Sequence, residues 1–312
     1  MKANILVTGC GGDIGQSIGK ILNESELVNE LYGFDISDKN AGKFIYSNFF
    51  IGLKYSDKNY LKNLENFIEE KRIDIIIPIS ESELRHFSEI NHLEAIGRAK
   101  ILTASAEALA IGFDKLATAN FLKENGFPYP KTTLVAEDNI PDYPVILKSR
   151  TGSGSKLVYK ADNKEDFNYI TSKHQDFIVQ EFLKDNQGEY TCGVFKSKKG
   201  EIRTLTFKRE LTGGYSGYGE IINNENIDKF LNKLAIKINL EGSINVQLRL
   251  TQKGPVVFEI NPRFSSTVLF RHMFGFKDLE WSIQDKLGIE IKPHINVEEG
   301  RRFYKGFNEY IS

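Results

Sequence analysis

The sequence predicts a chain of mixed class, with an α/β domain at the N-terminus followed by an α+β domain. Two patterns lead to this prediction. Near the N-terminus, an apolar strand is followed by spaced glycines and then a helical repeat, which is typical of a parallel α/β unit. Between residues 243 and 263, polar and apolar side chains alternate on both sides of a turn, which is typical of an antiparallel hairpin. The 312 residues are enough for two or three subdomains with cores of their own.

The composition limits the classes of partner. The chain carries 41 Lys and Arg against 42 Asp and Glu, which gives no electrostatic reason to expect nucleic acid or an anionic membrane as a partner. No apolar run reaches the length of a membrane-spanning helix, and residues 1–4 begin a strand instead of a signal peptide. The cysteines, Cys10 and Cys192, form no Cys-x-x-Cys pair and are predicted to be reduced thiols. We therefore expect a cytoplasmic protein that acts on small molecules.

Residues 1–108 are predicted to form the first domain, a small parallel sheet with helices on both sides. Its first strand is followed by Gly9, Gly12 and Gly15, and a later strand ends in Asp35, about where a dinucleotide-binding fold places its ribose acid. Taken alone, this pattern predicts an NAD(P)-binding oxidoreductase. The alternative is that the glycines serve strand–helix packing. The other elements expected here are helices over 57–70 and 82–97 and strands over 74–79 and 100–103.

Residues 109–312 are predicted to form the second domain, which has two lobes. Apolar residues at helical spacing predict helices over 113–126 and 227–238, the second of which covers a sheet. The predicted parts are a smaller lobe at about 112–178, a larger lobe at about 179–290 and a C-terminal segment at 291–312 that returns as a strand.

The smaller lobe carries a candidate phosphate site. A short apolar strand ends in Lys148 and is followed by Gly152, Ser153, Gly154 and Ser155. Glycines let backbone N–H groups approach phosphate oxygens closely, and the lysine adds a positive charge. The order of residues is not that of a Walker A motif, and an ordinary hairpin turn is the alternative interpretation.

The hairpin over 243–263 carries a candidate metal site. Gln247 lies on its first strand, and Glu259, Asn261 and Arg263 follow at intervals of two on its second strand. If the extended conformation continues, these side chains project from one face. Carboxylate and amide oxygens suit Mg²⁺, which completes its coordination with water and nucleotide phosphates. A solvated polar face is the alternative interpretation.

The Glu-x-Asn-Pro-Arg run over 259–263 resembles the magnesium-binding end of the ATP-grasp superfamily. The chain most resembles a single ATP-grasp unit of the carbamoyl-phosphate synthase large chain. This resemblance implies a Rossmann-like domain followed by a two-lobed ATP-grasp domain. It also implies a metal, Mg²⁺ or alternatively Mn²⁺, on Gln247, Glu259 and Asn261, with Arg263 at the transferred phosphate. The residues that it assigns to ATP are Lys115, Lys148, Gly152, Ser153, Gly154, Ser155, Glu181, Phe182, Leu183 and Glu189, with adenine read around 181–183 and the ribose by Glu189.

The acceptor site is predicted around Lys208 and Arg209, which precede a glycine- and tyrosine-rich stretch over 211–219. This stretch is expected to be a loop that closes over a substrate, and Arg209 is expected to pair with a substrate carboxylate, since a guanidinium matches a carboxylate bidentately. A flexible surface loop is the alternative.

The resemblance implies an ATP- and Mg²⁺-dependent ligase that joins a carboxylate to an amine through an acyl phosphate and releases ADP and phosphate. The expected partners are a small-molecule carboxylate, an amine and a second copy of the chain in a homodimer. The first alternative is a small-molecule kinase on the same fold, and the second is the NAD(P)-binding oxidoreductase.

Overall fold

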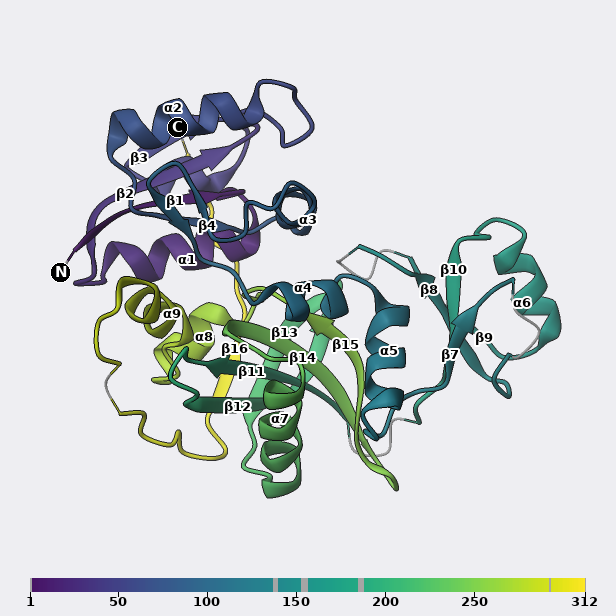
Figure 1. Cartoon of the computed structure of the whole chain (residues 1–312). Coiled ribbons are helices and arrows are strands. Elements are labelled where there is room, and N and C mark those ends of the chain that lie inside the picture. Colours follow the sequence, from purple (N-terminus) through teal and green to yellow (C-terminus); the bar gives the residue numbers. More distant parts are fainter. Residues whose placement is uncertain (1, 137–139, 153–156, 185–187, 292, 312) are drawn as a thin grey trace.

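The structure is a computed structural model that describes residues 2–136, 140–152, 157–184, 188–291 and 293–311 (Figure 1). Within these ranges the chain forms three β-sheets of six, four and six strands, with helices packed on their faces. Three residues of the predicted phosphate loop, Ser153, Gly154 and Ser155, lie outside the described residues.

The N-terminal sheet is parallel except at one edge and has helices on both faces, as predicted. Helix α1 (Asp13–Asn23) covers one face, while α2 (Tyr60–Lys71) and α3 (Glu81–Glu89) cover the other through buried apolar side chains. The central strands are buried on both faces and are therefore almost wholly apolar. The strands are β1 (Ala3–Thr8), β2 (Val28–Asp35), β3 (Asn48–Ile51), β4 (Ile75–Pro78), β5 (Ala95–Ile96) and β6 (Ala99–Ile101), in the order β3-β2-β1-β4-β6-β5.

Two predicted features of this domain need correction. The helix expected over 82–97 ends at Glu89, because Asn91 adopts a left-handed conformation (φ 57°) and the chain then turns into β5. Strand β3 is an additional edge strand, and its four residues are too few to show a period.

The second sheet forms the smaller lobe. Its strands are β7 (Thr132–Leu134), β8 (Val145–Ser149), β9 (Val158–Ala161) and β10 (Phe177–Glu181), in the order β7-β10-β8-β9, and all of its pairs are antiparallel. Helix α6 (Lys164–Thr171) covers one face over a small apolar core. Before the sheet come α4 (Ala106–Gly112) and α5 (Lys115–Glu124), so the predicted helix over 113–126 begins later than expected because Asp114 caps it. The predicted domain boundary at 108 falls inside α4 and stays a prediction.

The third sheet forms the larger lobe. Its strands are β11 (Glu189–Lys196), β12 (Ile202–Thr212), β13 (Tyr215–Ile221), β14 (Gly242–Thr251), β15 (Gly254–Asn261) and β16 (Arg302–Tyr304), in the order β15-β14-β11-β12-β13-β16. Helix α7 (Glu225–Lys237) covers one face, as predicted. The expected C-terminal strand is β16, which pairs with β13.

The stretch over 211–219 is not a loop, and this prediction is wrong. Strands β12 and β13 run through it and pair as a hairpin with Thr212 opposite Tyr215, so that only Gly213 and Gly214 form the turn. Both glycines have positive φ, at 58° and 88°, which a tight turn of this kind requires.

Helices α8 (Val268–Met273) and α9 (Asp278–Leu287) pack between the third sheet and the N-terminal domain. Val268, Leu279 and Ile283 share a core with side chains of α1, and Figure 1 shows both helices beside α1. Arg271 on α8 is fully buried and pairs with the buried Asp278 at 2.8 Å. The face of the third sheet that lies opposite α7 is therefore covered by α8 and α9 at one of its ends.

No helix in the described parts of the chain combines the length and the apolar composition that crossing a membrane requires.

Candidate active site

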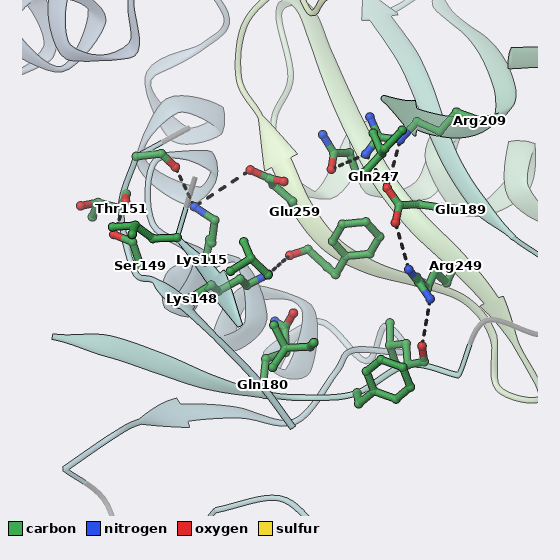
Figure 2. A pocket seen from close by; sticks show the side chains of 18 residues that line it. Lys115, Lys148, Ser149, Thr151, Gln180, Glu189, Arg209, Gln247, Arg249 and Glu259 are labelled. Atoms are coloured by element: carbon green, nitrogen blue, oxygen red, sulfur yellow. Dashed lines mark hydrogen bonds and ion pairs between the residues drawn. The ribbon is translucent and has the colours of Figure 1, made fainter. Parts of the chain in front are cut away.

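A cavity of about 540 Å³ lies between the second sheet and the uncovered end of the third sheet (Figure 2). Both sheets present polar side chains to it. Its described lining residues are Lys115, Ile146, Lys148, Ser149, Thr151, Gly152, Leu157, Val158, Gln180, Phe182, Leu183, Glu189, Arg209, Leu211, Gln247, Arg249, Phe258 and Glu259.

Two lysines meet at one end of the cavity. Lys148 projects from β8, is 6% exposed, and donates to the carbonyl of Phe258 across the cavity at 3.1 Å. Burial lowers the pKa of Lys148 to about 8, and the charge of Lys115 acts in the same direction, although Glu259 opposes it. The Nζ of Lys115 donates to the carbonyl of Gly152 at 2.8 Å. This end therefore concentrates positive charge that lacks full compensation.

Lys115 is held in place by the start of α5. The Asp114 side chain caps the helix by accepting from Leu116 N and Ala117 N, and it also pairs with Arg150 at 2.7 Å. These contacts lower the pKa of Asp114 despite the opposing effect of burial. The cap fixes the first residue of the helix, Lys115, toward the cavity.

A β-bulge places two consecutive residues in the cavity. Gln247 pairs with Glu259 whereas Leu248 pairs with Val257, so Phe258 has no partner in the ladder. Successive side chains of a regular strand point to opposite faces, but here Phe258 and Glu259 both line the cavity. The bulge also leaves the Phe258 carbonyl available to Lys148.

The predicted metal ligands only partly come together. Gln247 and Glu259 are directly opposite one another and line the cavity, with Glu259 Oε1 4.0 Å from the Nζ of Lys115. Asn261 is buried at the end of β15, outside the lining, and its Oδ1 accepts from Arg263 at 3.4 Å. The described residues contain no group of three or more His, Cys, Asp or Glu side chains that could hold a metal unaided. One carboxylate with nearby amide oxygens fits a cation that takes its other ligands from phosphates.

Arg263 lies beyond the end of β15, because the strand stops before Pro262. Its Nη1 donates to the carbonyl of Phe264 at 2.9 Å. Burial lowers the pKa of Arg263, while the carboxylates of Glu81 and Glu259 favour its charged form. Arg263 is thus close enough to Glu259 to be influenced by its charge, but it does not line the cavity.

A chain of charged contacts forms the wall on the third sheet. The Glu189 carboxylate accepts from Arg209 at 2.5 Å and from Arg249 at 3.1 Å. Arg209 also donates to Gln247 Oε1 at 2.9 Å, and Arg249 donates to the carbonyl of Leu183 at 3.1 Å. The dashed lines in Figure 2 follow this chain. Arg209 is thus already engaged by a protein carboxylate, in contrast to its predicted pairing with a substrate.

The other end of the cavity is more apolar. Phe182 and Leu183 line it, as expected, together with Ile146 and Val158. Glu181 does not: its Oε2 accepts from the backbone N–H of Lys131 at 3.1 Å. The prediction that the Glu181 side chain reads a base edge therefore has no support in the geometry.

The comparisons with known proteins agree with this geometry. Residues 113–267 match the family model described as ATP-grasp domain. The chain contains an ATP-grasp domain. The carbamoyl phosphate synthase large chain of Thermoplasma acidophilum is 24% identical over 241 aligned residues, covering 68% of this chain and 23% of that protein. The resemblance predicted from the sequence is therefore confirmed.

Two further similar proteins share one enzyme name. The N5-carboxyaminoimidazole ribonucleotide synthase of Aquifex aeolicus is 27% identical over 183 aligned residues, covering 53% of this chain and 49% of that protein. The ADP complex of an N5-carboxyaminoimidazole ribonucleotide synthetase has 16% identity and a TM-score of 0.76, covering 96% of this chain and 80% of the other. The structural likeness confirms the predicted fold class, an N-terminal domain followed by ATP-grasp lobes. The chain spans about half the length of the Aquifex relative.

Lys208 does not line the cavity, which corrects its prediction as part of the acceptor site. It neighbours Arg209 on β12, and neighbouring side chains of a strand point to opposite faces. Its ladder partner is Tyr190, which belongs to the core under α7. Lys208 therefore lies on the face of the sheet away from the cavity.

Arg249 and Gln180 line the cavity without having been identified from the sequence. Arg249 continues the alternation of Gln247 along β14, and this period is the signal that could have found it. Gln180 is the one polar side chain in the buried run Phe177–Gln180 of β10, which is unusual for a buried strand position.

The glycine loop of the N-terminal domain is occupied by its own contacts. Gly11 N donates to Asp35 Oδ2 at 2.8 Å, so both the loop amide and the acid are engaged with each other. A Cβ on Gly15 would lie 2.5 Å from the carbonyl oxygen of Gly9, which shows how closely α1 packs on the loop. These contacts favour the packing interpretation over the binding of a dinucleotide.

Proposed function

We propose that the protein is an ATP- and Mg²⁺-dependent ligase that joins a carboxylate to an amine. The observation that carries this proposal is the charge pattern of the cavity in the ATP-grasp domain. Among its described lining residues, four cationic side chains accompany two carboxylates, and one of these, Glu259, lies opposite the amide of Gln247. An excess of positive charge beside a carboxylate–amide pair suits a nucleoside triphosphate and its metal.

In this proposal, ATP lies along the cavity with its phosphates at the lysine end. Lys115 and Lys148 contact the phosphates, and the backbone at Gly152 lies beside them. The ribose hydroxyls bind Glu189, whose carboxylate is oriented by its contacts with Arg209 and Arg249. The base occupies the apolar end.

Glu259, Gln247 and Asn261 would hold Mg²⁺, which when bound neutralises charge on the phosphates. Glu259 is the ligand best placed for this, since its carboxylate faces the cavity and lies near Lys115. Reorientation of the Gln247 amide oxygen toward a metal would require Arg209 to give up its contact.

The reaction proceeds in two displacements. A carboxylate oxygen of the substrate attacks the γ-phosphorus of ATP, the bond to the β–γ bridging oxygen breaks, and ADP leaves. The amine then attacks the acyl carbon, phosphate departs with the electron pair of the acyl–oxygen bond, and the amine loses a proton as the amide forms. Such chemistry depends on positioning and charge, and in this proposal Arg263 neutralises the transferred phosphoryl group.

The test measures ADP release with Mg²⁺ and ATP across a panel of carboxylates, using hydroxylamine as a general nitrogen nucleophile. A ligase converts its carboxylate to a hydroxamate in amounts equal to the ADP released. The variant Glu259→Gln should lose this activity, whereas the charge-matched change Glu65→Gln on the exposed surface of α2 should retain it. A stable phosphorylated product without hydroxamate would instead establish the kinase alternative.

A further inference from the structure

We infer that Arg85, on α3 of the N-terminal domain, is a positioning residue for the phosphate end of the cavity and acts through Lys115. Arg85 is not among the described residues that line the cavity, so its effect on a ligand is indirect. The inference rests on the proposed function, because it takes Lys115 as a contact of the nucleotide phosphates. It gives the N-terminal domain an influence on the nucleotide site of the second domain.

The start of α3 is fixed to the rest of the N-terminal domain by a buried carboxylate. Glu83 is 6% exposed and accepts hydrogen bonds from two hydroxyl groups. Thr8, the last residue of β1, donates at 2.5 Å, and Tyr60, the first residue of α2, donates to the other carboxylate oxygen. The loss of either contact would leave a buried acceptor unpaired, which is costly. Helix α3 is therefore a rigid support for the side chains that it carries.

Arg85 extends from α3 to the junction of α4 and α5. Its Nη2 donates to the backbone carbonyl of Phe113, and its guanidinium carbon lies 4.5 Å from the centre of the Phe113 ring. A guanidinium suits both contacts at once, because it is planar and carries several donors. Leu84 of α3 and Leu109 of α4 pack with Phe113 in one apolar cluster, and Figure 1 shows α3 beside α4.

Glu81, one turn before Arg85 on α3, orients the guanidinium. Its Oε1 accepts from Nη2 at 2.9 Å and from Nε at 3.3 Å. The Glu81 side chain is 12% exposed and that of Arg85 is 30% exposed, so the pair is partly shielded from solvent. Partial shielding strengthens an ion pair relative to a fully exposed one. The guanidinium is therefore held in one orientation toward Phe113.

Phe113 immediately precedes the residues that place Lys115. Its carbonyl group belongs to the peptide bond with Asp114, whose side chain caps α5, and Lys115 is the first residue of that helix. A shift of the Phe113 carbonyl would therefore move the cap and the backbone of the lysine together. A misplacement of about 1 Å, even when its cause is remote from the site, can cost about 100-fold in rate. Arg85 thus fixes the start of α5 from the side of the N-terminal domain.

The experiment is a double-mutant cycle on the full chain. Calorimetry measures the dissociation constant of a non-hydrolysable ATP analogue in the presence of Mg²⁺. Arg85→Ala and Lys115→Met should each weaken binding by about 5-fold or more. Because Arg85 acts through Lys115, adding Arg85→Ala to Lys115→Met should weaken binding further by less than about 2-fold. The control Arg98→Ala removes an arginine of the same domain that pairs with Asp74 at 3.2 Å, and it should bind like wild type.

Guanidinium ion provides a second readout, which a general loss of stability would not produce. Millimolar guanidinium should restore most of the binding that Arg85→Ala loses, whereas methylammonium at the same ionic strength lacks the planar group and should not. If Arg85→Ala does not fold, Arg85→Lys takes its place in the cycle. Lysine keeps the charge but cannot hold the carbonyl and the ring together, so this variant should also weaken binding only while Lys115 is present.

The outcomes separate the inference from the proposed function. If wild type binds no ATP analogue, the proposed function fails and the inference fails with it. If wild type binds the analogue but the Arg85 variant or Lys115→Met binds equally well, the inference is wrong while the proposed function stands. The inference is also wrong if the losses of the two single variants add in the double variant. A loss that disappears in the Lys115→Met background and is restored by guanidinium supports the inference.

Discussion

Replacing Lys148 with methionine should have opposite effects on stability and on nucleotide binding. Burial lowers the pKa of Lys148 from 10.5 to about 8. Each pKa unit corresponds to about 1.4 kcal/mol, so the charged lysine destabilises the folded protein by about 3 kcal/mol at pH 7. Methionine has a similar volume and no charge, but it leaves the Phe258 carbonyl without its donor, which costs about 1–3 kcal/mol. The net expectation at pH 7 is a variant stabilised by about 0–2 kcal/mol that binds ATP at least 10-fold more weakly.

The pH dependence follows from the direction of the shift. Because the folded-state pKa lies below the unfolded value, the unfolded state binds more protons between about pH 8 and pH 10.5, and wild type gains stability as the pH rises through this window. The variant lacks this gain. Urea denaturation at pH 7 and pH 10.5 measures the free energy of unfolding of both proteins. The difference between wild type and variant should change by about 3 kcal/mol in favour of wild type at the higher pH.

If the difference in the free energy of unfolding between the two proteins stays constant with pH to within about 1 kcal/mol, Lys148 does not carry a buried charge that destabilises the fold. Binding of the Mg²⁺ complex of an ATP analogue, measured on the same samples, is the second readout. Equal affinity in wild type and variant would remove Lys148 from the phosphate site.

Three further predictions follow from named contacts. Glu259→Gln should make nucleotide affinity, measured by calorimetry, almost independent of Mg²⁺. Wild type and Glu65→Gln should bind the nucleotide at least 10-fold more tightly with Mg²⁺ than with EDTA. Equal Mg²⁺ dependence in all three proteins would exclude Glu259 as a metal ligand. Arg271→Met leaves the buried Asp278 without its cation and should lower the free energy of unfolding by about 3–5 kcal/mol in urea, and a loss below about 1 kcal/mol would contradict this. Gly15→Ala should destabilise the fold by about 1–3 kcal/mol through contact with backbone, without changing ATP affinity; a loss of ATP affinity in the folded variant would show that the loop contributes to the nucleotide site.

The parts of the fold with a clear period could be predicted from the sequence. The alternation over 243–251 fixes which side chains of β14 share a face, and Gln247 and Glu259 do meet across the hairpin. The capped start of α5 and the apolar strand before Lys148 likewise place both lysines at one end of the cavity. These features depend on neighbours in the sequence, and local physics is enough to specify them.

The remaining features depend on contacts that no local pattern contains. The bulge at Phe258 shifts the register by one residue, so it brings Phe258 into the cavity beside Glu259. The glycines at 213 and 214 are equally compatible with a flexible loop and with a two-residue turn. Only the pairing of β12 with β13 decides between these two structures. Glu181 turns away because the backbone N–H of Lys131 on an adjacent segment binds it.

The most direct test of the central claim is a thermal-unfolding comparison of Mg²⁺ with a non-hydrolysable ATP analogue against NAD(H) and NADP(H). A ligand at a hundred times its dissociation constant stabilises the native state by about 2.7 kcal/mol, which amounts to a few degrees for a chain of this size. We predict that the ATP analogue with Mg²⁺ raises the unfolding midpoint of wild type, that Glu259→Gln loses most of this rise, and that the nicotinamide cofactors have no effect. A rise with a nicotinamide cofactor alone would contradict the account and identify the N-terminal glycine loop as the working site.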